Sequence, residues 1–102
     1  MRVVRVGPLP ERAIEAAAAF HAQVLANLVP PPLEEALVLV FAPANHDHRG
    51  WRLAAIQDLA RTAAPVRVNA IAGDDEQAIA AALAWLEQAP GVTGQLLSVE
   101  NG

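Results

Sequence analysis

An unbroken apolar run, Ala36–Ala42, bounded by turn residues, constrains the fold of this chain more than any other feature. A strand with one face in water alternates apolar and polar side chains, whereas a run without alternation fits a strand that is buried on both faces. Strands of parallel sheets are buried in this way, because the helices that connect them cover the faces of the sheet. We therefore expect a parallel sheet in an α/β protein.

The remaining segments alternate between extended and helical patterns. Apolar or β-rich stretches predict strands at 2–6, 36–42, 66–72 and 95–99. Apolar residues at helical spacing predict three main helices: one from Glu11 to the proline run at 30–32, one over 51–62, and one that starts at 74–77 and stops at Pro90. The order β-α-β-α-β-α-β predicts a single α/β domain over residues 1–102, with about four mostly parallel strands and crossover helices.

The faces and ends of these helices also follow from the pattern. Pro10 suits the first position of the first helix, because a missing N–H costs nothing there. Asp47 is expected to cap the second helix, and Asp74 to form a capping box with Gln77. The expected apolar stripes are Ile14, Ala18, His21, Leu25 and Leu28 (flanked by Phe20 and Val24), then Trp51, Ala55, Leu59 and Thr62, then Ile79, Ala82, Leu83 and Leu86.

The three helices must be distributed over the two faces of the sheet. Crossovers between parallel strands are right-handed in about 98% of cases. If the strands lie in chain order, right-handed crossovers would place all three helices on one face and leave the other apolar face bare. Either the strand order reverses, or one helix crosses to the other face, or a second chain covers the gap.

The composition excludes several classes of function. The chain has no cysteine, so it cannot form disulfides, use a thiolate in catalysis or bind metals through sulfur. Its net charge is −4 and its seven basic residues are scattered arginines, so we expect no surface for nucleic acid. No apolar run approaches the ~18 residues that span a bilayer, and no signal-peptide pattern opens the chain. We expect a cytoplasmic protein that does not bind membranes.

Two stretches in the last third, Val66–Gly73 and Gly91–Gly102, lie on either side of an Ala-rich helix. With the segments before them, from about Phe20, they resemble the C-terminal half of a short-chain dehydrogenase/reductase, which has a Rossmann-like fold. The resemblance equates 36–42 with the fifth strand of that family, 51–61 with the helix of its catalytic pair, 66–73 with the sixth strand, 78–87 with the last long helix and 92–102 with the last strand.

The resemblance implies the fold of this family without its chemistry. Short-chain dehydrogenases work with a Tyr-x-x-x-Lys pair, and this chain contains neither tyrosine nor lysine. The positions that resemble the pair fall near Arg49 and Leu53, and the position that resembles the catalytic serine falls at 42–43, where the chain has Ala-Pro. The Gly-rich dinucleotide loop of the family has no counterpart here, so we expect no NAD(P) and no other cofactor.

We therefore expect a truncated, degenerate relative of the family that is not an enzyme by itself and that acts as an oligomerising or partner-binding subunit. Its first strand would present an edge of unpaired backbone groups, which a second copy or a full-length reductase-like partner would cover. Two alternatives stay open. The chain could be half of an oxidoreductase that takes NAD(P) and catalytic residues from a second chain, or a small protein that binds a ligand or metal through the loop at 45–52.

That loop holds the candidate ligand residues, which are Asn45, His46, Asp47, His48, Arg49 and Arg52. It follows a parallel strand, at the edge where α/β proteins bind ligands. A His-x-His pair can hold a metal, and two arginines near a helix start can bind an anion. A solvated polar loop explains the same residues. Because a structural zinc site needs four ligands and only one other histidine exists, no metal ligands are assigned.

Three other groups of residues have structural explanations. His21 lies on the stripe of the first helix, as a core or interface histidine would. The acidic cluster Asp74–Glu76 is explained by helix capping and by the helix dipole, without acid–base catalysis. Trp51 and Trp85 are expected to be packing residues. No catalytic residue is assigned.

Overall fold

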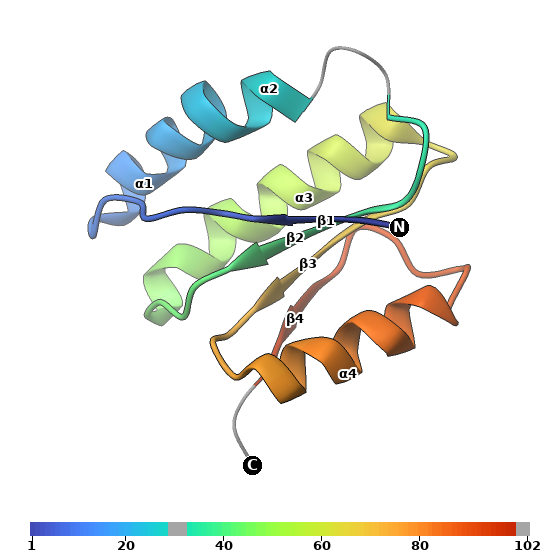
Figure 1. Ribbon diagram of the computed structural model, residues 1–102. Helices are drawn as coiled ribbons and strands as arrows, with labels where there is room; N and C mark the ends of the chain where they lie inside the picture. The colour runs from blue at the N-terminus through green and yellow to red at the C-terminus, as the bar shows by residue number, and fades with distance from the viewer. Residues whose placement is uncertain (29–32, 100–102) are drawn as a thin grey trace.

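A computed structural model describes residues 1–28 and 33–99 (Figure 1). Its strands are β1 (Arg2–Arg5), β2 (Leu37–Phe41), β3 (Val68–Ala72) and β4 (Leu96–Ser98). Helix α1 (Ala13–Ala19) continues through a π-helical segment, Phe20–Leu25, into α2 (Ala26–Leu28); α3 (Arg49–Ala63) follows a 3₁₀ turn, His46–His48; and α4 is Glu76–Glu87. None of the helices in these described stretches is both long and apolar enough to cross a bilayer.

The four described strands form one parallel sheet in chain order, β1-β2-β3-β4. Val38 of β2, for example, lies in register with Val3 of β1 and with Asn69 of β3. This arrangement confirms the expected α/β class and the parallel sheet. It also places the carboxyl ends of all four strands at one edge of the sheet (Figure 1).

The helices divide unequally over the two faces of the sheet. Helices α1 and α3 pack on one face, and α4 packs on the other (Figure 1). Because the strands follow the chain order, two crossovers on one face have the same hand, and the third, β3-α4-β4, has the opposite hand. Of the three expected arrangements, the structure has the second: one helix, α4, crosses to the other face of the sheet and covers it.

Strand β2 explains why both faces need cover. Its residues are all buried, and successive side chains point to opposite faces. Leu37, Leu39 and Phe41 belong to the core under α1 and α3, whereas Val38 and Val40 belong to the core that α4 closes. The expected strand buried on both faces is therefore confirmed. On the α4 side, Ile79 and Leu86 are buried and Ala82 and Leu83 pack against them, which also confirms the stripe expected for this helix.

The first helix differs from its prediction in its start and in its buried face. It begins at Ala13 rather than at Pro10, with Arg12 in extended conformation before it. The second half of the expected stripe is confirmed, since Phe20 and Leu28 are buried and Val24 and Leu25 pack against the core. The first half is wrong: Ile14 is 76% exposed, Ala18 and His21 are also exposed, and Ala16 is buried instead. Ala16 and Phe20 lie four residues apart on one face of the helix, and the large aromatic ring of Phe20 gains more from burial than Ile14 would. The expected stop at 30–32 lies outside the described residues.

The helix caps are shifted from the predicted residues. Asn45, and not Asp47, caps the turn before α3: its Oδ1 accepts a hydrogen bond from the backbone N–H of Asp47 at 2.9 Å. Asp75, and not Asp74, caps α4 by accepting from the N–H of Gln77 at 3.2 Å. Asn45 and Asp75 each have an extended backbone and accept from the N–H two residues later. An N-cap residue has this conformation because it is the last residue before the helical turn begins.

On α3, Ala55 and Leu59 are buried as expected and Trp51 is partly buried, but Thr62 is exposed. Its hydroxyl instead donates to the carbonyl of Asp58 one turn earlier, at 3.0 Å. The predicted stripe is therefore correct over the first part of the helix and wrong at its last residue.

Candidate functional site

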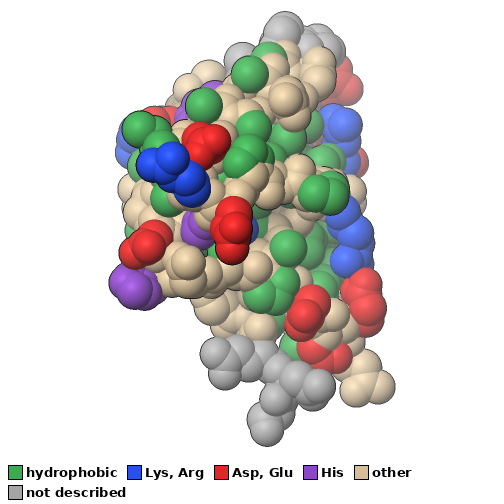
Figure 2. Space-filling model, turned by 90° about the vertical axis from the view of Figure 1, so that its left-hand side faces the viewer, with side chains coloured by type: hydrophobic (Ala, Val, Ile, Leu, Met, Phe, Trp, Pro, Cys, Tyr) green, Lys and Arg blue, Asp and Glu red, His purple; other side chains and the backbone are tan. Residues whose placement is uncertain are grey.

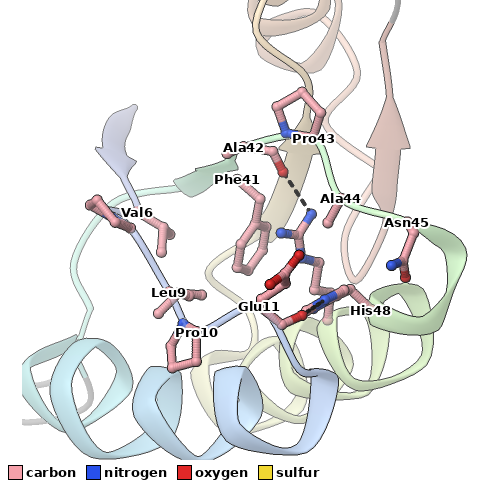
Figure 3. A pocket seen from close by; sticks show the side chains of 13 residues that line it. Val6, Leu9, Pro10, Glu11, Phe41, Ala42, Pro43, Ala44, Asn45 and His48 are labelled. Carbon is pink, nitrogen blue, oxygen red and sulfur yellow. Dashed lines mark hydrogen bonds between the residues drawn. The ribbon is translucent and has the colours of Figure 1, made fainter.

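A cavity of about 570 Å³ opens at the carboxyl ends of β1 and β2 (Figure 3). Two segments form its walls: residues 6–11, which follow β1, and residues 41–45, which begin with the last residue of β2. Arg52 of α3 and His48 of the turn before α3 complete the lining. Figure 2 views the molecule from the end toward which the strands point, and acidic, basic and apolar side chains are mixed over this face. The cavity lies where open α/β sheets bind ligands.

Arg52 is the most unusual residue of this cavity, because its charge is buried without an ion pair to any carboxylate of the described residues. Its side chain is 7% exposed. One Nη donates to the carbonyl oxygen of Ala42 at 2.9 Å, and the guanidinium carbon lies 4.6 Å from the centroid of the Phe41 ring. Nε is buried without a hydrogen-bond partner, and no acidic group of the described residues forms an ion pair with Arg52. Burial lowers the pKa of Arg52, since desolvation disfavours the charged form.

His48 holds the wall of the cavity together. It is 6% exposed, and both ring nitrogens are occupied. Nε2 lies 2.9 Å from the carbonyl oxygen of Glu11, which can only accept, and Nδ1 lies 3.1 Å from the indole nitrogen of Trp51, which can only donate. Nε2 therefore carries the proton. This bond joins the segment after β1 to the start of α3 across 37 residues of sequence (Figure 3).

Aromatic rings pack behind the cavity and position these polar groups. The ring centroid of Phe20 lies 5.4 Å from that of Phe41 and 5.4 Å from that of Trp51. Phe41 and Trp51 meet edge to face at 5.8 Å. Phe20 and Phe41 are fully buried, so the cluster fixes the ring over which the Arg52 guanidinium lies.

The structure brings most of the predicted loop residues around a second, smaller hollow of about 260 Å³ beside the ends of β3 and β4. Five of the six line it, together with the only serine of the chain, Ser98: these five are Asn45, His46, His48, Arg49 and Arg52. Asp47 lies outside this lining; its carboxylate is 3.3 Å from Nε2 of His46. Only Asn45, His48 and Arg52 also line the larger cavity.

The arrangement gives no support to a metal site at this loop. Both nitrogens of His48 are occupied by hydrogen bonds, while His46 points into solvent. No group of three or more His, Cys, Asp or Glu side chains comes together in the part of the chain that the structure describes.

The other candidates of the sequence lie apart from the cavity. His21 is exposed, and its Nδ1 donates to the carbonyl of Ala17 on its own helix at 2.7 Å, so it is not a core residue. In the acidic cluster, Asp75 caps α4 and Glu76 pairs with Arg5 at 3.0 Å. Trp85 is 54% exposed, and its expected role as a packing residue is wrong.

Sequence reasoning missed the wall formed by residues 6–11, including Glu11, whose backbone carbonyl holds His48. A signal was present, because the sequence Gly-Pro-Leu-Pro at 7–10 separates a strand from a helix without continuing either. The pattern could not show that this segment lines the same cavity as Arg52, because the bond that brings the segment to α3 joins Glu11 and His48 across 37 residues.

The positions that resemble the catalytic residues of short-chain dehydrogenases are occupied by unsuitable side chains. Ala42 and Pro43 line the cavity where the serine would be expected, and none of the described residues in its lining carries a hydroxyl or a thiol. Arg49 is exposed, and Leu53 packs against the core. These residues can bind or exclude a ligand, but they offer no phenol and no amine for proton transfer.

The family model described as short chain dehydrogenase-like protein matches residues 4–99, which extends the likeness from Phe20 back to the first strand. The chain belongs to this short-chain dehydrogenase-like family. Comparison with curated proteins found no match, and comparison with solved structures found none either.

Proposed function

We propose that this protein is a non-catalytic member of its family that acts as an oligomerising or partner-binding subunit through the outer edge of β1. The observation that carries the proposal is that the backbone of this edge strand forms hydrogen bonds to β2 on one side only in the described structure. Arg2 donates from its N–H to the carbonyl of Ala36 at 2.8 Å, and Val6 donates to the carbonyl of Val40 at 2.9 Å. Backbone groups of a strand alternate between its two sides, so those of Val3 and Arg5 point away from β2.

The side chains of β1 support the same reading. Val3 is 39% exposed, while the residues that pair with it along the sheet, Val38 and Asn69, are buried. An exposed strand edge attracts further strands unless charges or coverings protect it. Arg2 and Arg5 supply such charges on this edge, which favours a selected partner over indiscriminate aggregation. A second copy of the chain or a full-length reductase-like protein are the two occupants that we propose.

The non-catalytic part of the proposal rests on composition and on the cavity. The chain lacks tyrosine, lysine and the Gly-rich dinucleotide loop. Hydride chemistry in the manner of the family needs all three, and the cavity lining offers no hydroxyl in their place. The purified chain alone is therefore expected not to turn over NAD(P)H.

Sedimentation velocity at micromolar concentration tests the docking. We expect the wild type to sediment as a dimer or larger, or to co-purify in fixed ratio with an identified reductase-like chain. Val3→Pro should abolish either association, because it removes an outward N–H without removing a bond to β2. Val3→Ala is the matched control, since it shortens the side chain and keeps the N–H. A monomeric wild type without such a partner contradicts the proposal, as does association that Val3→Pro leaves intact.

A second function is favoured by the position of the cavity. Its wall at 6–11 continues directly from β1, so a chain paired with β1 would lie beside the cavity. The assembly could then be a reductase in which the partner supplies NAD(P) and the catalytic residues. Turnover of NAD(P)H by the complex and not by either separated chain would support this function, and an inactive complex would exclude it.

A further inference from the structure

We propose that the cavity at the ends of β1 and β2 binds a small organic acid with an apolar body, and that Arg52 receives its carboxylate. This site can be tested separately from the docking edge, because it depends on a side chain of α3 and on the open cavity that this side chain lines. The cavity volume, about 570 Å³, is of the size that small-molecule sites have.

The need for an anion comes from the buried charge of Arg52. A guanidinium has five N–H donors, and the described part of the protein satisfies one of them, through Ala42. Burying a charge is costly unless it is paired and hydrogen-bonded, and here no carboxylate of the described residues pairs with it. An incoming carboxylate supplies both the missing charge and the missing acceptors, and planar carboxylates match the fork of a guanidinium.

The site is already shaped for this contact. The bond to Ala42 and the packing over Phe41 hold the guanidinium in place before any ligand arrives. Figure 3 shows the bond to Ala42 on one side of the Phe41 ring, with Val6, Leu9 and Pro10 on the other side. A ligand whose charged end meets Arg52 therefore lies with its body along apolar walls.

The charges of the lining suit a monoanion better than a dianion. Arg52 is the only side chain with a fixed positive charge among the described residues that line the cavity, and Glu11 contributes a carboxylate to the same lining. A phosphate dianion or a dicarboxylate would gain one cation and face repulsion from Glu11. An aliphatic or aromatic monocarboxylate has an apolar end opposite its carboxylate, and this end can pack against Val6 and Leu9.

Calorimetric titration of the wild type with hexanoate, hexan-1-ol and inorganic phosphate tests the class of ligand without any mutation. We expect hexanoate to bind at least about tenfold more tightly than the alcohol of equal chain length, the minimum that a charge-assisted hydrogen bond provides. Phosphate should bind more weakly than hexanoate. Equal binding of acid and alcohol, or no binding of hexanoate at millimolar concentration, overturns the proposal.

Variants then assign the site to particular residues. Arg52→Met keeps most of the stem and removes the charge, so hexanoate affinity should fall at least about tenfold, to that of the alcohol. Arg61→Met, on the exposed side of the same helix, removes an equal charge and should leave affinity unchanged. Glu11→Gln should tighten phosphate binding, because the repelling carboxylate is lost while the backbone bond to His48 stays. Unchanged hexanoate affinity in a folded Arg52→Met, or unchanged phosphate affinity in Glu11→Gln, contradicts the assignment.

Discussion

The buried face of the first helix is open to a sharp test, because the sequence pattern predicts a buried Ile14 and the structure leaves this side chain exposed. Phe20→Ala removes a fully buried ring that contacts Phe41 and Trp51, each at a centroid distance of 5.4 Å. Truncation of a buried phenylalanine to alanine costs about 3–5 kcal/mol, as lost transfer energy plus the cavity left behind. Small domains have total stabilities of only about 5–15 kcal/mol, so this loss is a large share.

Ile14→Ala is the matched control on the same helix. The pattern of the sequence places Ile14 on the buried stripe, but the structure leaves it 76% exposed. A surface substitution of this kind changes the free energy of unfolding by less than about 0.5 kcal/mol. Urea denaturation followed by far-ultraviolet circular dichroism measures both values. Since about 1 kcal/mol shifts the melting temperature of a domain this small by roughly 4–8 °C, thermal melts should separate the two variants by more than about 10 °C.

Two results would refute the reasoning. If Ile14→Ala destabilises the protein as much as Phe20→Ala does, the helix is turned toward the stripe that the pattern favours. If neither variant loses stability, the aromatic cluster does not hold α1 on the sheet. The second result would also weaken the account of the cavity, because the same cluster positions Phe41 beneath Arg52.

Further predictions concern the polar contacts. Trp51→Phe keeps an aromatic ring but removes the N–H that His48 accepts at 3.1 Å, so unfolding in urea should show a loss of about 1–3 kcal/mol, the penalty of an unsatisfied buried group; no loss would mean that water replaces the indole. Asp75→Ala removes the cap of α4 and should lower the free energy of unfolding by about 0.5–2 kcal/mol, whereas Asp74→Ala should be close to neutral. A larger loss for Asp74→Ala than for Asp75→Ala would mean that Asp74 caps the helix, as the sequence pattern predicts.

The proposed docking edge and the proposed acid site both assign a binding role to this member of the short-chain dehydrogenase-like family. The cavity keeps the place at the carboxyl ends of the strands where α/β proteins bind ligands, while its lining carries an arginine, a histidine and apolar walls. Such a lining can recognise a ligand and has no group suited to hydride chemistry. Both proposals describe binding without turnover by the chain alone, and the experiments above can refute each of them separately.

Local patterns in the sequence determined the type and order of the elements. The uninterrupted run in β2 predicts burial on both faces, because the period of a strand is set by its backbone and any polar face would appear every second residue. The stripe on α4 is equally readable, because its face packs on one layer only. The absence of tyrosine, lysine and cysteine limits the chemistry before any fold is known.

Contacts between distant segments decided the rest. The face on which α4 packs depends on the apolar residues of β2 and β3 that α1 and α3 leave bare. The face that the first helix buries depends on which aromatic rings Phe20 can contact, and these rings belong to β2 and α3. The cavity exists because Glu11 and His48 meet across 37 residues. Periodicity records which residues share a face of one element, but the free energy that selects among such faces comes from partners elsewhere in the chain.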